Sequence, residues 1–274
     1  MKKYLFILLL VMIFASCADK PLVIIQVADA QLGFDAAIKG QQPGAVYVND
    51  LSYEAEYLRK AVTVINELSP DVVIYTGDQV NIVDNEEQWQ LFTEIISGID
   101  ADILQLHIPG NHDVAFPDGK VDSAPFVQRF GSDRFVSDHG DVRLVGINSN
   151  LIKYDAPAES EHREWLETVL SETPAENVKI IFSHHPFFIT DVDEEDSYFP
   201  IQRAKRRDYF DMFAASGVDA VFAGHLHDNR AGEYEGIPML TTTSSGYQLG
   251  DGPASIRVIT IKDGQVSEEL VPII

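Results

Sequence analysis

The stretch Ile108–Asp113, with the sequence IPGNHD, follows a predicted strand over residues 103–108 and decides how the other motifs are interpreted. Its proline and glycine end the strand, because proline cannot donate to a ladder and glycine permits a sharp turn. Asn111 offers an amide oxygen to a cation, His112 offers a proton near neutral pH, and Asp113 can orient an imidazole. An ordinary polar turn favours the same residue types, so this loop alone does not distinguish a turn from a site.

Strands and helices alternate along the chain. Runs of apolar residues predict strands at 22–28, 72–75, 103–108, 142–148, 178–182 and 218–223. Helical spacing of apolar residues, with Ser52 as the N-cap of the first helix, predicts helices at 53–68, 86–97, 160–170 and 202–216. Residues 34–52 are expected to form a long loop, and the tail is expected to form antiparallel strands at 238–242, 255–261 and 265–271. This order indicates a parallel sheet covered by helices, and residues 17–274 are expected to form a single domain.

Five of the predicted strands end in groups that can ligate divalent cations. These are Asp29 with Gln31, Asp78, Asn111, His184 or His185, and His225 with His227. An i, i+2 spacing in an extended segment would put Asp29 with Gln31, and His225 with His227, on one side of the chain. Mixed imidazole, carboxylate and amide donors suit Mn, Fe or Zn. Because there are more donors than one ion needs, the sequence favours two divalent ions bridged by Asp78, which would supply a hydroxide and neutralise phosphoryl charge.

Taken singly, each histidine is better explained as a hydrogen-bonded turn residue, but this explanation fails for all of them together. We assign three others to a structural role, because His107 lies inside a predicted strand and His139 and His162 lie in polar surroundings.

The motifs, taken in order, resemble those of the calcineurin-like metallophosphoesterase superfamily. They are Asp29-Ala30-Gln31, Gly77-Asp78-Gln79-Val80-Asn81, Gly110-Asn111-His112-Asp113, His184-His185-Pro186 and Gly224-His225-Leu226-His227. The resemblance implies an α/β fold, a four-layer αββα sandwich of two mixed sheets flanked by helices, with a dinuclear centre at its edge. One ion would take Asp29, Gln31, Asp78 and His227, and the other would take Asp78, Asn111, His184 and His225. His112 would contact the phosphoryl oxygens or protonate the leaving group, Asp113 would orient it, and His185 would lie outside the ligand set.

The first motif departs from the usual Asp-x-His of the superfamily. Gln31 replaces a basic imidazole nitrogen by a neutral amide oxygen, which is a weaker ligand. Together with Tyr198-Phe199, the basic segment Arg203–Arg207 and the sequence GYQLG at 246–250, the Asp-x-Gln motif resembles the branch called calcineurin-like phosphoesterase domain-containing proteins, some described as serine/threonine phosphatases. Gln31 is therefore either the ligand of that branch or a weakened site.

Three features near the motifs are open to two interpretations. Tyr198 and Tyr247 are candidates to line the pocket or to pack against the core. The acidic run over residues 191–196 is either a solvated loop or a lid over the metals.

The N-terminus has the pattern of a lipoprotein signal peptide over residues 1–16. Lys2-Lys3 precede an apolar run over residues 5–14, which is shorter than a membrane span of ~20 residues. The sequence FASC at 14–17 resembles the lipobox of bacterial lipoproteins, and its Cys17 is the only cysteine. We therefore expect lipidation at Cys17 and a lipid-anchored protein on the extracytoplasmic side, periplasmic or surface, of a bacterial cell envelope. An unmodified cysteine in a plain signal peptide is the alternative.

The strongly negative net charge argues against polyanionic partners. The formal net charge is −23, and removal of Lys2 and Lys3 leaves 18 basic against 43 acidic residues, a charge of −25. Nucleic acid is not expected, since binding to phosphates needs a basic face. A phosphorylated small molecule is expected as the substrate, because metal charge dominates a site locally. The oligomeric state is left open.

The expected function is a metal-dependent hydrolase in which a metal-bridging hydroxide attacks a phosphomonoester or a phosphodiester. The alternative is a catalytically weak envelope lipoprotein that binds a metal or another ligand.

Overall fold

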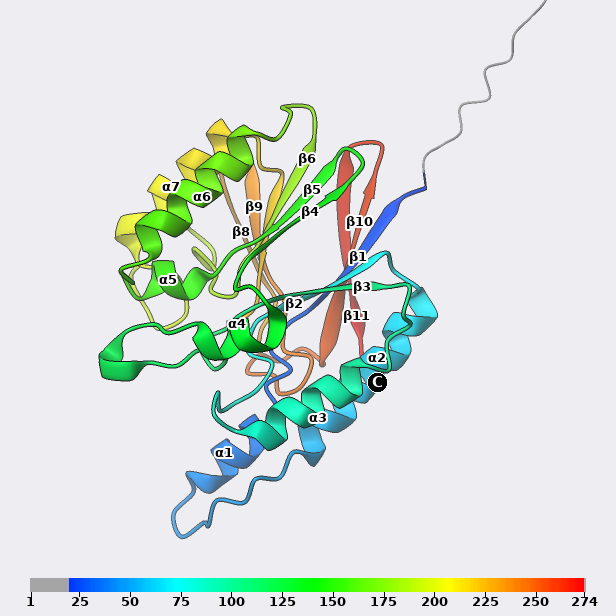
Figure 1. Ribbon diagram of the computed structural model, residues 1–274, viewed down its shortest axis with the longest axis vertical. Coiled ribbons are helices and arrows are strands. Elements are labelled where there is room, and N and C mark those ends of the chain that lie inside the picture. The colour runs from blue at the N-terminus through cyan, green and yellow to red at the C-terminus, as the bar shows by residue number, and fades with distance from the viewer. Residues whose placement is uncertain (1–19, 274) are drawn as a thin grey trace, which may run out of the picture.

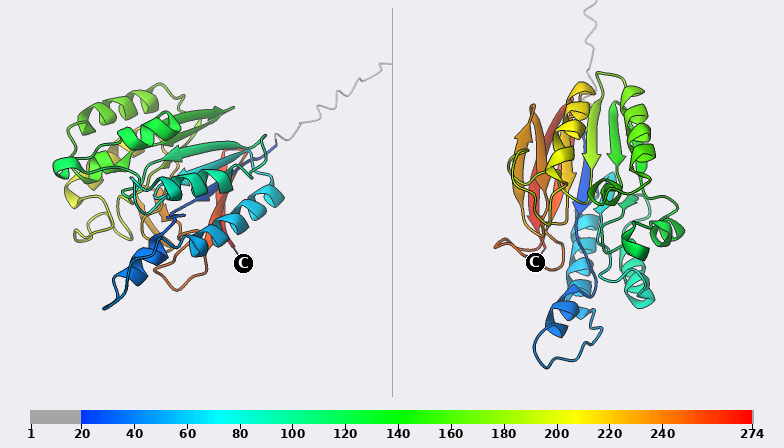
Figure 2. Two further views of the ribbon diagram at one scale, coloured as in Figure 1. Left: turned by 60° about the horizontal axis from the view of Figure 1, so that its bottom comes forward. Right: turned by 90° about the vertical axis from the view of Figure 1, so that its left-hand side faces the viewer.

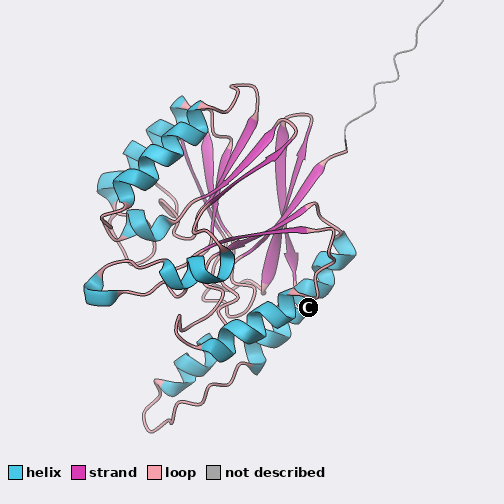
Figure 3. Ribbon diagram, in the orientation of Figure 1, coloured by secondary structure: helices cyan, strands magenta, loops and turns pink. Residues whose placement is uncertain are grey.

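The computed structural model describes residues 20–273, and its strands form two mixed sheets (Figures 1 and 3). The first sheet has the order β11-β10-β1-β2-β3 and the second the order β4-β5-β6-β7-β9-β8. The strands of the first sheet are β1 (Leu22–Val27), β2 (Val72–Thr76), β3 (Leu104–Ile108), β10 (Ser255–Lys262) and β11 (Gln265–Pro272). Those of the second are β4 (Phe135–His139), β5 (Val142–Gly146), β6 (Val178–Phe182), β7 (Ala220–Ala223), β8 (Arg230–Tyr234) and β9 (Ile237–Thr241).

The strands that lead into the motifs are parallel to their neighbours. Strands β1, β2 and β3 run parallel in the first sheet, and β5, β6, β7 and β9 run parallel in the second. The antiparallel strands β10 and β11, and β4 and β8, complete the two sheets toward their edges. Because parallel strands end on the same side of a sheet, the loops that follow them lie together.

Helices cover the outer face of each sheet (Figures 1 and 2). The helices among the described residues are α1 (Phe34–Gly40), α2 (Ser52–Leu68), α3 (Glu86–Ile96), α4 (Ala124–Phe130), α5 (Ser149–Lys153), α6 (Glu159–Ser171) and α7 (Arg203–Ala215), with a 3₁₀ turn, η1, at Pro117–Gly119. Helices α2 and α3 pack on the first sheet, and α6 and α7 pack on the second. Within residues 20–273, no helix combines the length and the apolar character that a membrane span requires.

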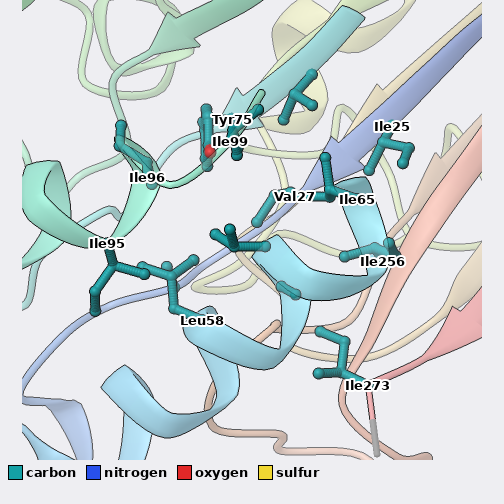
Figure 4. Packing of buried hydrophobic residues seen from close by; sticks show 14 of the residues in the cluster. Ile25, Val27, Leu58, Ile65, Tyr75, Ile95, Ile96, Ile99, Ile256 and Ile273 are labelled. Atoms are coloured by element: carbon teal, nitrogen blue, oxygen red, sulfur yellow. The ribbon is translucent and has the colours of Figure 1, made fainter. Parts of the chain in front are cut away.

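The period-two pattern of the strands gives the sandwich its layers. In β1, Ile25 and Val27 face α2 in one hydrophobic cluster, as Figure 4 shows, whereas Ile24 faces the second sheet in another. Both faces of the strand are therefore buried, which explains the continuous apolar runs of the sequence. A third cluster lies between the second sheet and helices α6 and α7. The predicted four-layer sandwich is confirmed.

Part of the predicted loop over residues 34–52 is wrong, because residues 34–40 form α1. Ala36 and Ala37 favour a helix, and Asp35 in the first turn forms an ion pair with Lys39 one turn later. The sequence pattern did not predict this short helix, because the nearby glycines and proline are typical of a loop.

The predicted cap of α2 is also wrong. Ser52 is the first helical residue, and its backbone N–H donates to Asp50 Oδ1 at 3.0 Å. The first backbone N–H groups of a helix have no partner within the helix. Here the Asp50 side chain accepts from one of them, as the side chain of a capping serine would.

The strands of the tail do not form one antiparallel set. Strands β10 and β11 pair antiparallel in the first sheet, whereas β9 lies in the second sheet, parallel to β7 and antiparallel to β8. The chain changes sheets between β9 and β10, since β10 completes the first sheet beside β1. Local patterns do not encode such a change, because it is fixed by long-range pairing.

Candidate metal centre

The loops after β1, β2, β3, β6 and β7 meet at one edge of the sandwich and are joined by backbone hydrogen bonds. Gln31 N donates to Asp78 O at 2.8 Å, and Asp29 N donates to Gly77 O at 3.2 Å. In the second sheet Gly224 N donates to His184 O at 3.0 Å. The two sets of loops meet where the backbone N–H of His225, after β7, donates to the carboxylate of Asp29, after β1.

One group of donors is built around Asp29, which is fully buried. Its carboxylate accepts from the backbone N–H of His225 at 3.0 and 2.9 Å, and its Oδ1 lies 3.5 Å from His227 Nε2. The Nδ1–H of His227 donates to the Tyr247 carbonyl, so that Nε2 is the free nitrogen. Gln31 Oε1 is buried and has no hydrogen-bond partner among residues 20–273, while its Nε2 donates to Asn81 Oδ1 at 3.4 Å.

The second group is built around Asp78 and His184. His184 Nδ1–H donates to the Thr76 carbonyl at 2.9 Å, which turns Nε2 toward Asn111 Oδ1 at 3.1 Å and Asp78 Oδ2 at 3.4 Å. A neutral His184 would therefore point a lone pair at two acceptor oxygens, and only a proton or a cation resolves this contact. The buried His225 Nε2 also lacks a partner within the described chain.

The backbone of these loops differs from the extended segments that the sequence predicts. Asp29, Gln31, His225 and His227 have φ values of 50°, 39°, 67° and 51°, in the left-handed region. The paired donors are thus aimed by tight turns and not by the alternation of a strand.

Glycines make room for the donors beside these turns. A Cβ at Gly110 would lie 2.1 Å from Asp78 Oδ1, and one at Gly224 would lie 2.6 Å from Asp29 Oδ2. The carboxylates therefore occupy space that only glycine leaves open.

The buried carboxylates and imidazoles of the cluster shift one another's pKa values. Burial favours the neutral form of Asp78, but His184 and His112 outweigh it and hold the pKa of this carboxyl well below its usual range. Burial would lower the pKa of His184, yet Asp78 raises it to about 9. In His225, burial and the neighbouring His184 lower the pKa well below its ordinary value. A divalent cation would compete with the protons on these donors, as metal binding generally does.

The ring of His112 is oriented differently from the prediction. Its Nδ1–H donates to the Asn81 carbonyl at 2.8 Å, and its backbone N–H donates to Asp78 Oδ1 at 2.8 Å. The expected role of Asp113 as the group that orients this ring is corrected, because Asn81 holds Nδ1.

Asp113 instead ties two motif loops together. Its Oδ1 accepts from Gln79 N at 2.9 Å and Val80 N at 3.3 Å, and its Oδ2 accepts from Gly110 N at 2.8 Å. Burial, with the nearby charge of Asp78, raises the pKa of Asp113 to about 8, against backbone donors that favour its ionised form.

The three further site candidates lie around these donors. His185 is buried, with Nδ1 3.1 Å from Ser149 Oγ and with its ring centroid 4.4 Å from that of His225. The Tyr198 ring centroid lies 5.2 Å from the ring centroid of His225. Tyr247 contributes its carbonyl to His227, while its ring packs edge-on against Phe34 at 5.3 Å.

Sequence reasoning missed the start of α5 as a support of the site. Asn150 Nδ2 donates to the carbonyls of Pro109 and Gly110, both at 3.2 Å, and Ser149 contacts His185. The sequence did contain a sign of this support, because the polar residues 148–150 directly follow an apolar strand, as the other motifs do.

The acidic run at 191–196 is held by α7 and does not form a lid. Asp193 pairs with Arg207, Asp196 with Arg206, and Glu195 with Arg203. Glu194 accepts from the backbone N–H groups of Ile189 and Thr190. The interpretation as a charged lid over the metals is therefore replaced by an ion-paired loop.

The three histidines assigned to a structural role make structural contacts. His107 stacks between Tyr75 and Phe130 at ring-centroid distances of 4.5 and 4.2 Å, and His139 Nε2 lies 2.9 Å from Ser137 Oγ. Burial lowers the pKa of His162 to about 4, which lets its Nε2 accept from Asn148 N at 3.1 Å.

The cluster suits divalent cations. Ligand atoms of Asp29, Asp78 and His184 lie within 4.8 Å of one another, and so do those of His184, His185 and His225. The donor set is mixed: it has two carboxylates, several imidazoles and the Gln31 oxygen that lacks a hydrogen-bond partner among the described residues. Mn, Fe and Zn all bind such combinations of oxygen and nitrogen ligands.

Comparison with known proteins gives the family. A family model described as calcineurin-like phosphoesterase matches residues 24–229. The chain belongs to this family. The phosphoesterase is 31% identical over 261 residues to the serine/threonine-protein phosphatase CPPED1 of Danio rerio, covering 90% of this chain and 83% of that one.

Solved structures share the fold of this phosphoesterase. A purple acid phosphatase from Lupinus luteus superposes with a TM-score of 0.69 at 15% identity, covering 93% of this chain and 52% of the lupin chain, so this chain spans about half of that enzyme. A dimetal phosphatase from Danio rerio superposes with a TM-score of 0.59 at 15% identity, covering 93% of this chain and all (100%) of that one. The predicted family, fold and activity class are confirmed. The protein is a metal-dependent phosphoester hydrolase of a dinuclear family.

Proposed function

We propose that the cluster holds two divalent metal ions, one on Asp29, Gln31, Asp78 and His227 and the other on Asp78, Asn111, His184 and His225. The observation that carries this assignment is the convergence of His184 Nε2 on Asn111 Oδ1 and Asp78 Oδ2, a contact between acceptors that a bound cation satisfies as a proton does. The orphaned Gln31 Oε1 supports the amide as a true ligand of the first ion. When bound, such ions supply activation of water and neutralisation of phosphoryl charge.

His112 is the side chain that we assign to the phosphoryl group. It lines the pocket together with Asp78, His225 and His227. The Nδ1–H of His112 is engaged by the Asn81 carbonyl. In the imidazolium form, which carries a proton on both ring nitrogens, Nε2–H can donate a hydrogen bond to a phosphoryl oxygen or its proton to the leaving oxygen. Asp113 acts through the loops that it joins, and so is a positioning residue.

The test is hydrolysis of phosphate mono- and diesters by the purified full chain in Mn²⁺. We expect the His112→Gln variant to lose activity by about 10²- to 10⁴-fold, the usual contribution of a general acid or base. Its metal content should stay that of the wild type, because His112 is not in the ligand set. His139→Gln is the matched control and should keep full activity. Equal rates for His112→Gln and the wild type would remove His112 from the mechanism, and absence of hydrolysis in all forms would favour the binding lipoprotein.

A small phosphate ester is the substrate that we favour. The pocket over the donors has a volume of about 60 Å³, far below the several hundred Å³ that drug-sized ligands occupy. The zebrafish relative is named for action on phosphoproteins, but a location outside the cytoplasm favours a small ester. The alternative of a catalytically weak lipoprotein rested on Gln31, and the family and the donor set do not favour it.

We infer that Cys17 is lipidated and anchors the protein to a bacterial envelope membrane on its extracytoplasmic side. The inference rests on the sequence, because residues 1–16 and Cys17 lie outside the described residues. In the sequence Cys17 precedes β1 (Leu22–Val27), whereas the donors Asp29 and Gln31 follow the carboxyl end of that strand. The catalytic edge would then be carried away from the lipid.

Cys17→Ser should abolish incorporation of labelled fatty acid and move the protein from the membrane to the soluble fraction in a bacterial host. Ser16→Ala serves as the control, because it leaves the acylated sulfur in place. Membrane association that survives in Cys17→Ser, without label, would exclude a lipid anchor at this residue.

A further inference from the structure

We propose that the site selects phosphate monoesters whose alcohol part is uncharged and apolar, preferably aromatic. This inference rests on the proposed function and specifies its substrate class. The selecting element is an apolar collar, defined here as Phe34, Tyr198, Phe199 and Leu249, which lines the pocket beside the metal donors.

The collar presents apolar surface to solvent at the mouth of the pocket. Tyr198 is 62% exposed and Leu249 is 54% exposed, although both adjoin a deeply buried cluster of polar groups. Exposed apolar surface at the rim of a polar site is typical of a binding surface. The rings nearest to the donors are Tyr198, 5.2 Å from the His225 ring, and Phe34, 5.3 Å from the His227 ring.

Three segments far apart in the sequence form the collar. Phe34 begins α1, Tyr198 and Phe199 precede α7, and Leu249 lies between β9 and β10. Leu249 N donates to the His227 carbonyl at 3.1 Å, which fixes the third segment against a donor loop. The collar is therefore attached to the same loops that carry the donors.

A buried lysine beside the collar is used by the fold. Lys153 is 8% exposed, and its Nζ donates to the Ser197 carbonyl at 3.3 Å and to the Pro200 carbonyl at 2.5 Å. These carbonyls flank Tyr198 and Phe199. Lys153 thus holds the aromatic segment in place, and its ammonium is engaged with the chain.

No lysine or arginine is found among the described residues that line the pocket. A second phosphate or a carboxylate on the substrate would meet apolar side chains there, because the arginines of α7 pair with the acidic run instead. Burying an unpaired anion is costly, whereas an apolar ring gains from the contact. The collar therefore favours a single phosphoryl group on an apolar alcohol.

A second explanation is that Tyr198 merely covers His225 and keeps water out. In that case its removal would slow hydrolysis of every ester by the same factor. The two explanations are separated by comparing esters with the same reacting group and different alcohol parts.

The test uses three primary alkyl monoesters in Mn²⁺, namely 2-phenylethyl phosphate, ethyl phosphate and 2-carboxyethyl phosphate. Because all three release a primary alcohol, differences in kcat/KM report mainly on the collar and not on leaving-group chemistry. We expect the phenylethyl ester to exceed the ethyl ester by about tenfold, which corresponds to about 1.4 kcal/mol, and the carboxyethyl ester to be the poorest.

Tyr198→Ala should reduce the phenylethyl-to-ethyl ratio of kcat/KM about tenfold, through KM, and Tyr198→Phe should preserve it because the ring remains. Tyr47→Ala, which changes a half-exposed tyrosine outside the pocket, should leave both esters unaffected. Binding of 2-phenylethylphosphonate against ethylphosphonate, measured by calorimetry, should show the same ratio without turnover.

Hydrolysis of all three esters with an unchanged ratio in Tyr198→Ala would overturn the proposal while leaving the phosphoesterase function intact. A uniform loss for all esters would assign Tyr198 to covering the site and would also overturn it. If the phosphonates bind and no ester is hydrolysed, the proposed activity fails and the collar remains as a binding surface.

Discussion

Replacing Asp78 by alanine is expected to abolish hydrolysis and to reduce bound metal at the same time. Its carboxylate lies between the two donor groups, with Oδ2 3.4 Å from His184 Nε2 and with Asp29 in the same set of ligand atoms. A carboxylate shared by two sites cannot be removed without weakening both. We expect kcat to fall at least about 10³-fold, more than the loss of a single hydrogen-bond donor to the transition state.

The metal content of the same sample identifies the cause. Elemental analysis after dialysis should find about two ions per wild-type chain and at most one in Asp78→Ala. Asp84→Ala is the matched control, because Asp84 is an exposed carboxylate in the loop after the same strand and should change neither quantity. Full activity of Asp78→Ala at saturating Mn²⁺ would show that Asp78 is not a bridge.

The location of the site was predictable because apolar strands ended in ligand-type side chains. Asp78 and His184 follow β2 and β6, whose residues are all buried, and burial on both faces places these strands in the centre of a sandwich. Parallel strands then deliver their following residues to one edge. Asp29 and His225 also follow parallel strands, β1 and β7, and therefore lie at the same edge, although these strands belong to different sheets.

The directions of the side chains were not predictable from these patterns. Asp29 and His225 adopt left-handed backbone conformations that non-glycine residues rarely take, and the turns that impose them depend on hydrogen bonds between distant loops. For the same reason the partner of His112 was missed. A backbone carbonyl, that of Asn81, leaves no residue-type signal in the sequence.

The short elements show a related limit. Helix α5 has five residues, and its start is stabilised by Asn148 Oδ1, which accepts from Asn150 N at 3.2 Å. A segment of this length carries no helical period to detect, and its stability comes from tertiary contacts. The support that Asn150 gives to Gly110 could therefore be found only in three dimensions.

The corrected role of Asp113 leads to the second prediction, a large loss of stability in Asp113→Ala. This change leaves the buried backbone N–H groups of Gly110, Gln79 and Val80 without an acceptor. Unsatisfied buried donors cost about 1–3 kcal/mol each. Because relaxation and entry of water offset part of this cost, we expect the free energy of unfolding to fall by about 3–5 kcal/mol. Urea denaturation in the presence of EDTA measures this change.

Asp113→Asn should retain more of this stability, since one amide oxygen can still accept from the N–H groups of Gln79 and Val80. Asp102→Ala, at an exposed aspartate before β3, should change the free energy of unfolding by less than about 0.5 kcal/mol. A loss in Asp113→Ala no larger than that of this control would show that Asp113 does not hold the loops together.

The pH dependence gives an independent check of the same residue. The pKa of Asp113 is raised to about 8 in the folded protein, against about 4 in an unfolded chain. The proton held by the folded form therefore contributes stability below about pH 4, and this contribution is lost as the pH rises toward 8. In EDTA, the stability of the wild type relative to Asp113→Asn should decline across this interval and level off above it. A difference that is constant or grows with pH would mean that the carboxylate is ionised throughout, held so by its three backbone donors.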